Sequence, residues 1–133
     1  MEPFEFLPRV QRLADPGAAC AMFATMAEEE VEVAAFVYLD GDQRVLGMRE
    51  LRSNAHDTFE LPIRAIVGDA LRHDARGVVM AHNHPSGDST PSNADREATR
   101  MLARALEPIG VRLLDHLVVT RTGITSFRTM GLL

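Results

Sequence analysis

A chain of 133 residues with 46% hydrophobic residues is long enough for one domain with a real core and too short for two. The formal net charge of −5 disfavours the phosphate-neutralising surface that sequence-independent nucleic-acid binding needs, so we do not expect nucleic acid as the partner. Cys20 is the only cysteine, which excludes an internal disulfide and a cysteine-based metal cluster.

Residues 1–29 are expected to form an N-terminal extension. It ends in a helix over residues 18–29, which are good helix formers followed by acids. The extension has acids and prolines where a signal peptide needs a basic start and an apolar stretch. Because no apolar run approaches the roughly 20 residues of a membrane span, we expect a soluble, cytoplasmic protein without membrane contact.

Residues 30–133 are expected to form one α/β domain, a mixed sheet flanked by helices. Asp40-Gly41 is typical of a hairpin turn, and Pro62 suits the first turn of a helix. The expected elements are, in chain order, strands over residues 31–39 and 44–51, a polar loop over 53–60, a helix over 62–74, a strand over 77–81, a loop over 82–92, a helix over 93–107, and strands over 111–120 and 124–127.

The most informative segment follows the short apolar strand over residues 77–81. His82 and His84 are two positions apart where this strand ends, and in extended chain such side chains point to the same side. Asp95 comes eleven residues later, just inside the next helix, and the Gly/Pro-rich loop can bring its carboxylate back to the histidines. Two imidazoles and one carboxylate, with a fourth position left open, are typical of a catalytic zinc site.

Each part of this pattern also has a purely structural interpretation. Ser92 and Asp95 fit the S-x-x-D signature of a helix N-terminus, and histidines near a strand end are often only hydrogen-bonded structure. Capping and catalysis can coexist at Ser92, since a helix start already aims its hydroxyl toward the loop. Because all of these residues lie close together in the sequence, we predict one zinc ion per chain, held by His82, His84 and Asp95.

Zinc-dependent hydrolysis also needs a base that takes a proton from water, and a carboxylate outside the ligand set is the natural candidate. Residues 28–32 (EEEVE) offer four of them. Glu32 differs from the others because it lies between apolar residues at the start of an otherwise buried strand, where a carboxylate is costly without a partner. Glu30, one strand period away, remains the alternative.

The pattern H-N-H-P-S-G-x-x-x-P-S-x-x-D, with an upstream glutamate, resembles the JAMM metal motif of the JAB/MPN domain superfamily. More narrowly, AHNHPSGDSTPSNAD, LLDHLVV and the terminal SF…G resemble the RadC family from about residue 30 to the C-terminus. The resemblance implies a cytidine-deaminase-like architecture. It also implies His82, His84 and Asp95 as metal ligands, Glu32 as general acid/base, and Ser92 as the hydroxyl that assists the oxyanion.

The resemblance implies a zinc metallopeptidase or isopeptidase that acts on a protein or peptide, including ubiquitin-like conjugates. Two alternatives stay open. RadC-like proteins are often labelled DNA repair proteins, which suggests a metal-dependent nuclease or repair accessory, although nothing before residue 30 resembles a helix-hairpin-helix segment. The other is a metal-bearing binding module without turnover. For Asp115 and His116 in LLDHLVV we favour a structural hydrogen-bonding role.

Overall fold

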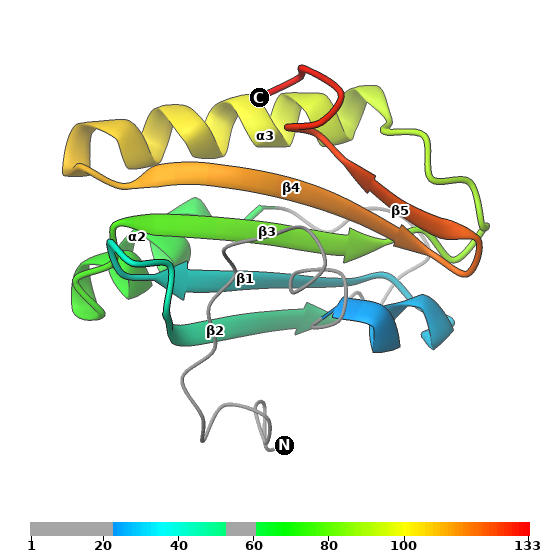
Figure 1. The fold of residues 1–133 in the computed structure, drawn as a ribbon, viewed down its shortest axis with the longest axis horizontal. Coiled ribbons are helices and arrows are strands. Elements are labelled where there is room, and N and C mark those ends of the chain that lie inside the picture. The colour runs from blue at the N-terminus through cyan, green and yellow to red at the C-terminus, as the bar shows by residue number, and fades with distance from the viewer. Residues whose placement is uncertain (1–22, 53–60) are drawn as a thin grey trace.

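Five strands form one mixed sheet in the computed structural model, which describes residues 23–52 and 61–133 (Figure 1). In chain order the elements are η1 (Ala24–Glu28), β1 (Val33–Leu39), β2 (Val45–Arg52), α2 (Ile63–Arg72), β3 (Gly77–Asn83), α3 (Asn93–Leu106), η2 (Glu107–Ile109), β4 (Arg112–Thr120) and β5 (Gly123–Ser126). The sheet order is β2-β1-β3-β4-β5. β3 and β4 are parallel and the other neighbours are antiparallel. The predicted α/β fold class is confirmed.

The sheet separates two apolar cores. One face packs against α2 and α3, and the other packs against η1, whose Met26 is buried together with the preceding Phe23. Because both faces are covered, β1 and β3 are buried at all seven of their positions, which explains why each appears in the sequence as an apolar run. Side chains alternate between the two cores along these strands, so every second residue of β3 faces the helices.

α3 connects the parallel strands β3 and β4, which a tight turn cannot join. The helix follows the N-cap Ser92 and gives way at Glu107 to η2, which contains Pro108. Gly110 then adopts a left-handed conformation with a φ of 75°, which a glycine adopts without steric cost. In the described residues, no helix is both long and apolar enough to cross a membrane.

The structure differs from the predicted elements at several boundaries. β1 begins at Val33, so Glu32 lies just before the strand, and β3 continues through Asn83 because its pairing with β4 extends into the polar residues. The β1–β2 turn spans residues 40–44, and its positive φ of 62° lies at Gln43, outside the Asp40-Gly41 pair from which the turn was predicted.

Two of the predicted elements fall wholly or partly outside the described residues. The described part of the predicted helix over residues 18–29 forms only the 3-10 helix η1. Residues 18–22 and the predicted loop over 53–60 lie outside the described residues.

Candidate metal centre

The end of β3 brings two imidazoles together on the face of the sheet that the helices cover. His82 lies in the strand and His84 follows its last residue, and the Nε2 atoms of the two rings are 2.9 Å apart. The ring centroids are 4.7 Å apart. The side chain of His82 is almost fully buried, whereas that of His84 is partly open to solvent. The alternation of a strand therefore presents both Nε2 atoms to one point, as the His-x-His spacing predicts.

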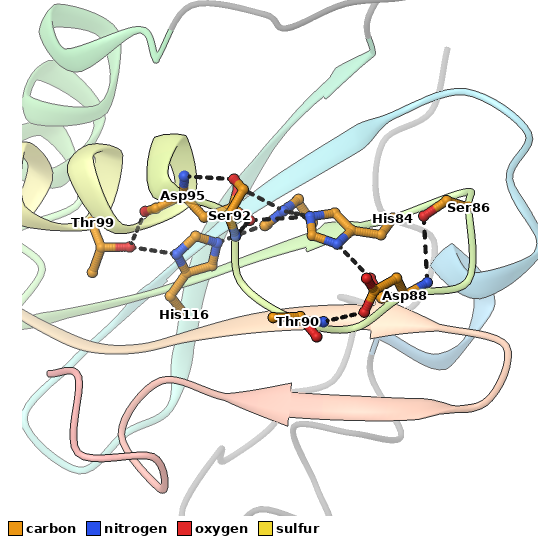
Figure 2. A network of polar contacts seen from close by, with 9 residues as sticks. His84, Ser86, Asp88, Thr90, Ser92, Asp95, Thr99 and His116 are labelled. Carbon is orange, nitrogen blue, oxygen red and sulfur yellow. Dashed lines mark hydrogen bonds and ion pairs between the residues drawn. The ribbon is translucent and has the colours of Figure 1, made fainter.

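Asp95 reaches the same point from the first turn of α3. Its Oδ1 lies 3.2 Å from His82 Nε2 and its Oδ2 lies 3.1 Å from His84 Nε2. The carboxylate is held by a capping box: the Ser92 N–H donates to Asp95 Oδ2 at 2.8 Å, and the Asp95 N–H donates to Ser92 Oγ at 3.0 Å (Figure 2). The cap thus fixes the side chain that faces the histidines.

The loop after β3 orients His84. Its Nδ1 lies 2.7 Å from the carbonyl oxygen of Asp88, and because a carbonyl can only accept, this nitrogen carries the hydrogen (Figure 2). A neutral ring then has a free lone pair on Nε2. The loop returns toward His84 through a turn in which the Gly87 N–H donates to the His84 carbonyl at 3.0 Å. Gly87 has a φ of 93°, a conformation that other residues rarely adopt.

A buried histidine supports His82 from behind. Nδ1 of His82 lies 2.7 Å from Nε2 of His116 in β4, and Nδ1 of His116 lies 2.6 Å from the Thr99 hydroxyl in α3. Thr99 in turn donates to the Asp95 carbonyl at 2.7 Å. The His116 ring stacks on Phe127, with centroids 4.4 Å apart. Three elements thus meet beneath the candidate ligands.

These contacts shift the pKa values of the site. Partial burial raises the pKa of the Asp95 carboxyl, but hydrogen bonds from His82 and His84 outweigh it and bring the pKa well below its usual range. The hydrogen bond to Asp95 raises the pKa of His84, and the charge of Glu32 acts in the same direction. Burial lowers the pKa of His116 to about 3, so this ring is neutral near pH 7. Asp95 therefore faces the histidines as a carboxylate.

Glu32 lines a cavity of about 110 Å³ together with His82 and Asp95. Apolar side chains form the rest of its described lining: Leu61, Met80, Ala94 and Ala98. Glu30, the alternative base, is exposed and is not among the residues that line this cavity in the described part of the chain. The structure therefore places Glu32, rather than Glu30, beside the candidate ligands.

Asn83 holds the backbone on both sides of Glu32. As the residue between the two histidines, it points to the opposite face of the sheet. Its Oδ1 accepts from the Val33 N–H at 2.6 Å, and its Nδ2 donates to the Val31 carbonyl at 2.9 Å. The bond to Val33 is buried and the bond to Val31 is partly buried, and Asn83 itself is 1% exposed. The H-N-H triplet thus supplies two candidate ligands and fixes the segment that carries the carboxylate.

The donor set fits a zinc ion. The ligand atoms of His82, His84 and Asp95 all lie within 4.8 Å of one another, and the group could hold a metal ion. Imidazole nitrogens and a carboxylate oxygen are among the donors that Zn²⁺ prefers, and three protein ligands are the number that a catalytic site uses. The second ring nitrogen of His84 also fits this assignment. Histidines that bind a metal usually donate their other N–H to a carbonyl or a similar acceptor, and Nδ1 of His84 donates to the Asp88 carbonyl.

Ser92 lies at the edge of this group. Its hydroxyl oxygen accepts from Asp95 and its side chain is exposed, so the capping interpretation is confirmed. Its predicted contact with an oxyanion stays a prediction. The sequence interpretation had no role for Thr99 or Asn83 and gave His116 only a structural one. One signal in the sequence could have pointed to His116. A polar residue inside an apolar run such as LLDHLVV is expected to have a hydrogen-bond partner, since burying a polar side chain without one is costly.

Comparison with known proteins agrees with this arrangement. A family model described as RadC-like JAB domain matches residues 13–132. A UPF0758 protein from Bordetella petrii is 38% identical over 130 residues, which are 97% of this chain and 58% of the relative. UPF0758 proteins from Cupriavidus pinatubonensis and Symbiobacterium thermophilum are 46% and 39% identical, covering 80% and 91% of this chain and 47% and 52% of their own lengths.

The chain spans about half the length of these curated relatives. The matched span begins before residue 30, where the sequence motifs start. The division into an extension over residues 1–29 and a domain over 30–133 stays a prediction.

Proposed function

The chain belongs to the family of RadC-like JAB domains, and from that premise we propose that it is a zinc-dependent hydrolase that cleaves a peptide or isopeptide bond. The observation that carries this proposal is the convergence of His82 Nε2, His84 Nε2 and the Asp95 carboxylate within 4.8 Å, with Glu32 beside them in the same cavity. This is a set of three ligands and one free carboxylate, which metal-assisted hydrolysis requires.

The residues of the chain have distinct roles in this reaction. When bound, zinc polarises the substrate carbonyl and lowers the pKa of water toward neutrality. Glu32 accepts a proton from the attacking water and transfers it to the leaving amine as the C–N bond breaks. Ser92 donates its hydroxyl hydrogen to the carbonyl oxygen as negative charge develops there.

The lining of the cavity favours an amide over a phosphodiester. In the described part of the chain it holds two carboxylates, from Glu32 and Asp95, and no arginine. With Asp95 bound to the metal, Glu32 is the free carboxylate of this lining and disfavours a phosphate group, for which the described lining offers no cationic side chain, whereas an uncharged peptide or isopeptide bond needs none. The apolar wall, which includes Met80 and Ala98, can accept an aliphatic group next to the scissile bond. These features support a peptide substrate more than nucleic acid.

A cleavage screen with matched glutamate variants tests this function. The zinc-loaded full chain is incubated with quenched peptide libraries, ubiquitin-like conjugates, and single- and double-stranded DNA. We expect cleavage of a peptide or isopeptide bond, and a fall of about 10² to 10⁴ in kcat for Glu32→Gln with zinc content unchanged. Glu30→Gln is the matched control and should keep full activity. Cleavage of DNA alone, or an inactive Glu30→Gln beside an active Glu32→Gln, would contradict the proposal.

A further inference from the structure

A continuous chain of hydrogen bonds runs behind the candidate ligands. It starts at His82 in β3, passes through His116 in β4 and Thr99 in α3, and ends on the carbonyl of Asp95. The three contacts measure 2.7, 2.6 and 2.7 Å, and the residues His82, Thr99 and His116 are all at most 3% exposed. The chain thus connects one candidate ligand to the backbone of another without reaching solvent.

The number of hydrogens fixes the direction of every bond in this chain. Thr99 has a single hydroxyl hydrogen, and it must go to the Asp95 carbonyl, which can only accept. The Thr99 oxygen can therefore only accept from His116, so Nδ1 of His116 carries a hydrogen. The bond from Thr99 to the Asp95 carbonyl therefore determines which atom donates and which accepts in the bond between His116 and Thr99.

The same reasoning extends to His82. The His116 ring is fully buried and stacks on Phe127, and a single hydrogen lies between its Nε2 and Nδ1 of His82, which are 2.7 Å apart. A neutral ring with its hydrogen on Nδ1 offers a lone pair at Nε2, so His82 must donate from its own Nδ1. The Nε2 atom of His82 is the remaining ring nitrogen, and it faces His84 and Asp95.

We infer that Thr99 and His116 are positioning residues that fix the tautomer and orientation of His82, so that its Nε2 is presented to a metal ion. This inference rests on the proposed metal site. It also explains how His82 and Asp95 are held in fixed positions relative to each other. The hydrogen-bond chain that orients His82 ends on the first turn of α3, which carries Asp95. Partners of this kind that support a metal ligand contribute about 10- to 100-fold to metal affinity.

Histidine nitrogen NMR on the zinc-free full chain reads the tautomers directly. We expect His116 with its hydrogen on Nδ1 in the wild type and in Thr99→Ser, which keeps the hydroxyl. Thr99→Val removes the acceptor, so the hydrogen of His116 should move to Nε2 and that of His82 away from Nδ1. Thr120→Val is the matched control, because Thr120 is a buried threonine whose hydroxyl contacts Thr122 and Gly123. A wild-type His116 with its hydrogen on Nε2, or an unchanged Thr99→Val spectrum, would overturn the inference.

Zinc affinity, measured by competition with a chelator, gives the second readout. The dissociation constant should rise about 10- to 100-fold in Thr99→Val and stay near the wild-type value in Thr99→Ser and Thr120→Val. An equal dissociation constant in all four proteins would overturn the positioning role. The two failures are distinguishable: a wild type with the expected tautomers that binds no zinc contradicts the proposed function, and one that binds zinc with the opposite tautomers contradicts this inference.

Discussion

Asp95 combines two roles in one carboxylate. One oxygen accepts the Ser92 N–H of the capping box and also lies 3.1 Å from His84, and the other lies 3.2 Å from His82. A helix cap is a strongly preferred local structure, so the local sequence itself orders this side chain before any metal binds. The S-x-x-D signature therefore has a structural meaning and a chemical one at once, and neither excludes the other.

Substitution of Ser92 separates these two roles. Ser92→Ala removes the cap acceptor and should lower the free energy of unfolding by about 0.5 to 2 kcal/mol. If the hydroxyl also donates to an oxyanion, kcat should fall by about 10² to 10³. Ser92→Asp restores a good cap but has no hydrogen to donate, so we expect a folded and almost inactive protein.

Thermal melts and steady-state rates measure both effects. Ser86→Ala is the control, because Ser86 lies in the same loop and its hydroxyl contacts only the Asp88 N–H, at 3.4 Å, among the described residues. It should leave both stability and turnover unchanged. A folded, fully active Ser92→Asp protein would show that Ser92 is only a cap.

Asn83 affects Glu32 through the backbone. Asn83→Leu leaves the buried Val33 N–H without its acceptor, which costs about 1 to 3 kcal/mol, and also removes the partly buried bond to the Val31 carbonyl, so the segment that carries Glu32 is freed. We expect kcat to fall while the zinc dissociation constant stays unchanged, because no candidate ligand is touched. In a double-mutant cycle, Asn83→Leu should have little further effect on kcat in the Glu32→Gln background. Fully additive losses would show that Asn83 does not act through Glu32.

α2 is attached to the sheet by a second polar cluster, on the same face as the site. Asp69 is 4% exposed, and its Oδ2 accepts from Arg49 Nε at 2.5 Å and from the Tyr38 hydroxyl at 2.8 Å. Arg72 also pairs with this carboxylate. The hydrogen bond from Arg49 lowers the pKa of Asp69, against a smaller opposing effect of burial. A buried acid on the inner face of a helix is therefore explained by three partners.

This cluster predicts a pH-dependent contribution to stability. Because the folded pKa of Asp69 is below its ordinary value of 3.8, the ionised form stabilises the fold above pH 3.8 and this stabilisation is lost as the pH falls through the folded pKa. Asp69→Asn should lower the free energy of unfolding by about 1.5 to 3 kcal/mol at pH 7, and the difference from wild type should shrink below pH 3.8.

Urea denaturation between pH 7 and pH 2 measures this difference. Tyr38→Phe is the matched control, since it removes one hydrogen bond but leaves the carboxylate and its arginines. It should cost about 1 kcal/mol and keep the pH dependence of the wild type. An Asp69→Asn deficit that stays constant across this pH range would contradict the assignment.

At the scale of elements, the sequence predicts what local chemistry determines. The apolar runs of β1 and β3 and the cap of α3 are local signals, and the elements they predict are present. The end of β3 depends on its pairing with β4, in which His82 lies opposite Val118. The polar residues at this end of the strand do not by themselves indicate that register. Likewise, the turn after β1 is set by Asp40, whose Oδ1 accepts two backbone N–H groups, and not by the glycine that follows it.

At the scale of the whole molecule, the site combines groups that are distant in the sequence. His82, His84 and Asp95 lie within one loop of each other and could be predicted together from their spacing. His116 could not be placed behind His82 from sequence alone, because the contact requires the parallel register of β3 and β4 and the packing of α3 over both. The same holds for Asn83 and Val33 at the start of β1, which are 50 residues apart.

Metal content tests the central claim most directly. The full chain, purified without chelators and loaded with zinc, is dialysed and its zinc measured by elemental analysis, beside His82→Ala, Asp95→Ala and the control His73→Ala. His73 is an exposed histidine after α2 that stacks on Tyr38, outside the site. We predict one zinc per chain in the wild type and the control, and loss of zinc in both His82→Ala and Asp95→Ala. Full zinc content in both of these variants, or no zinc in the wild type, would contradict the account.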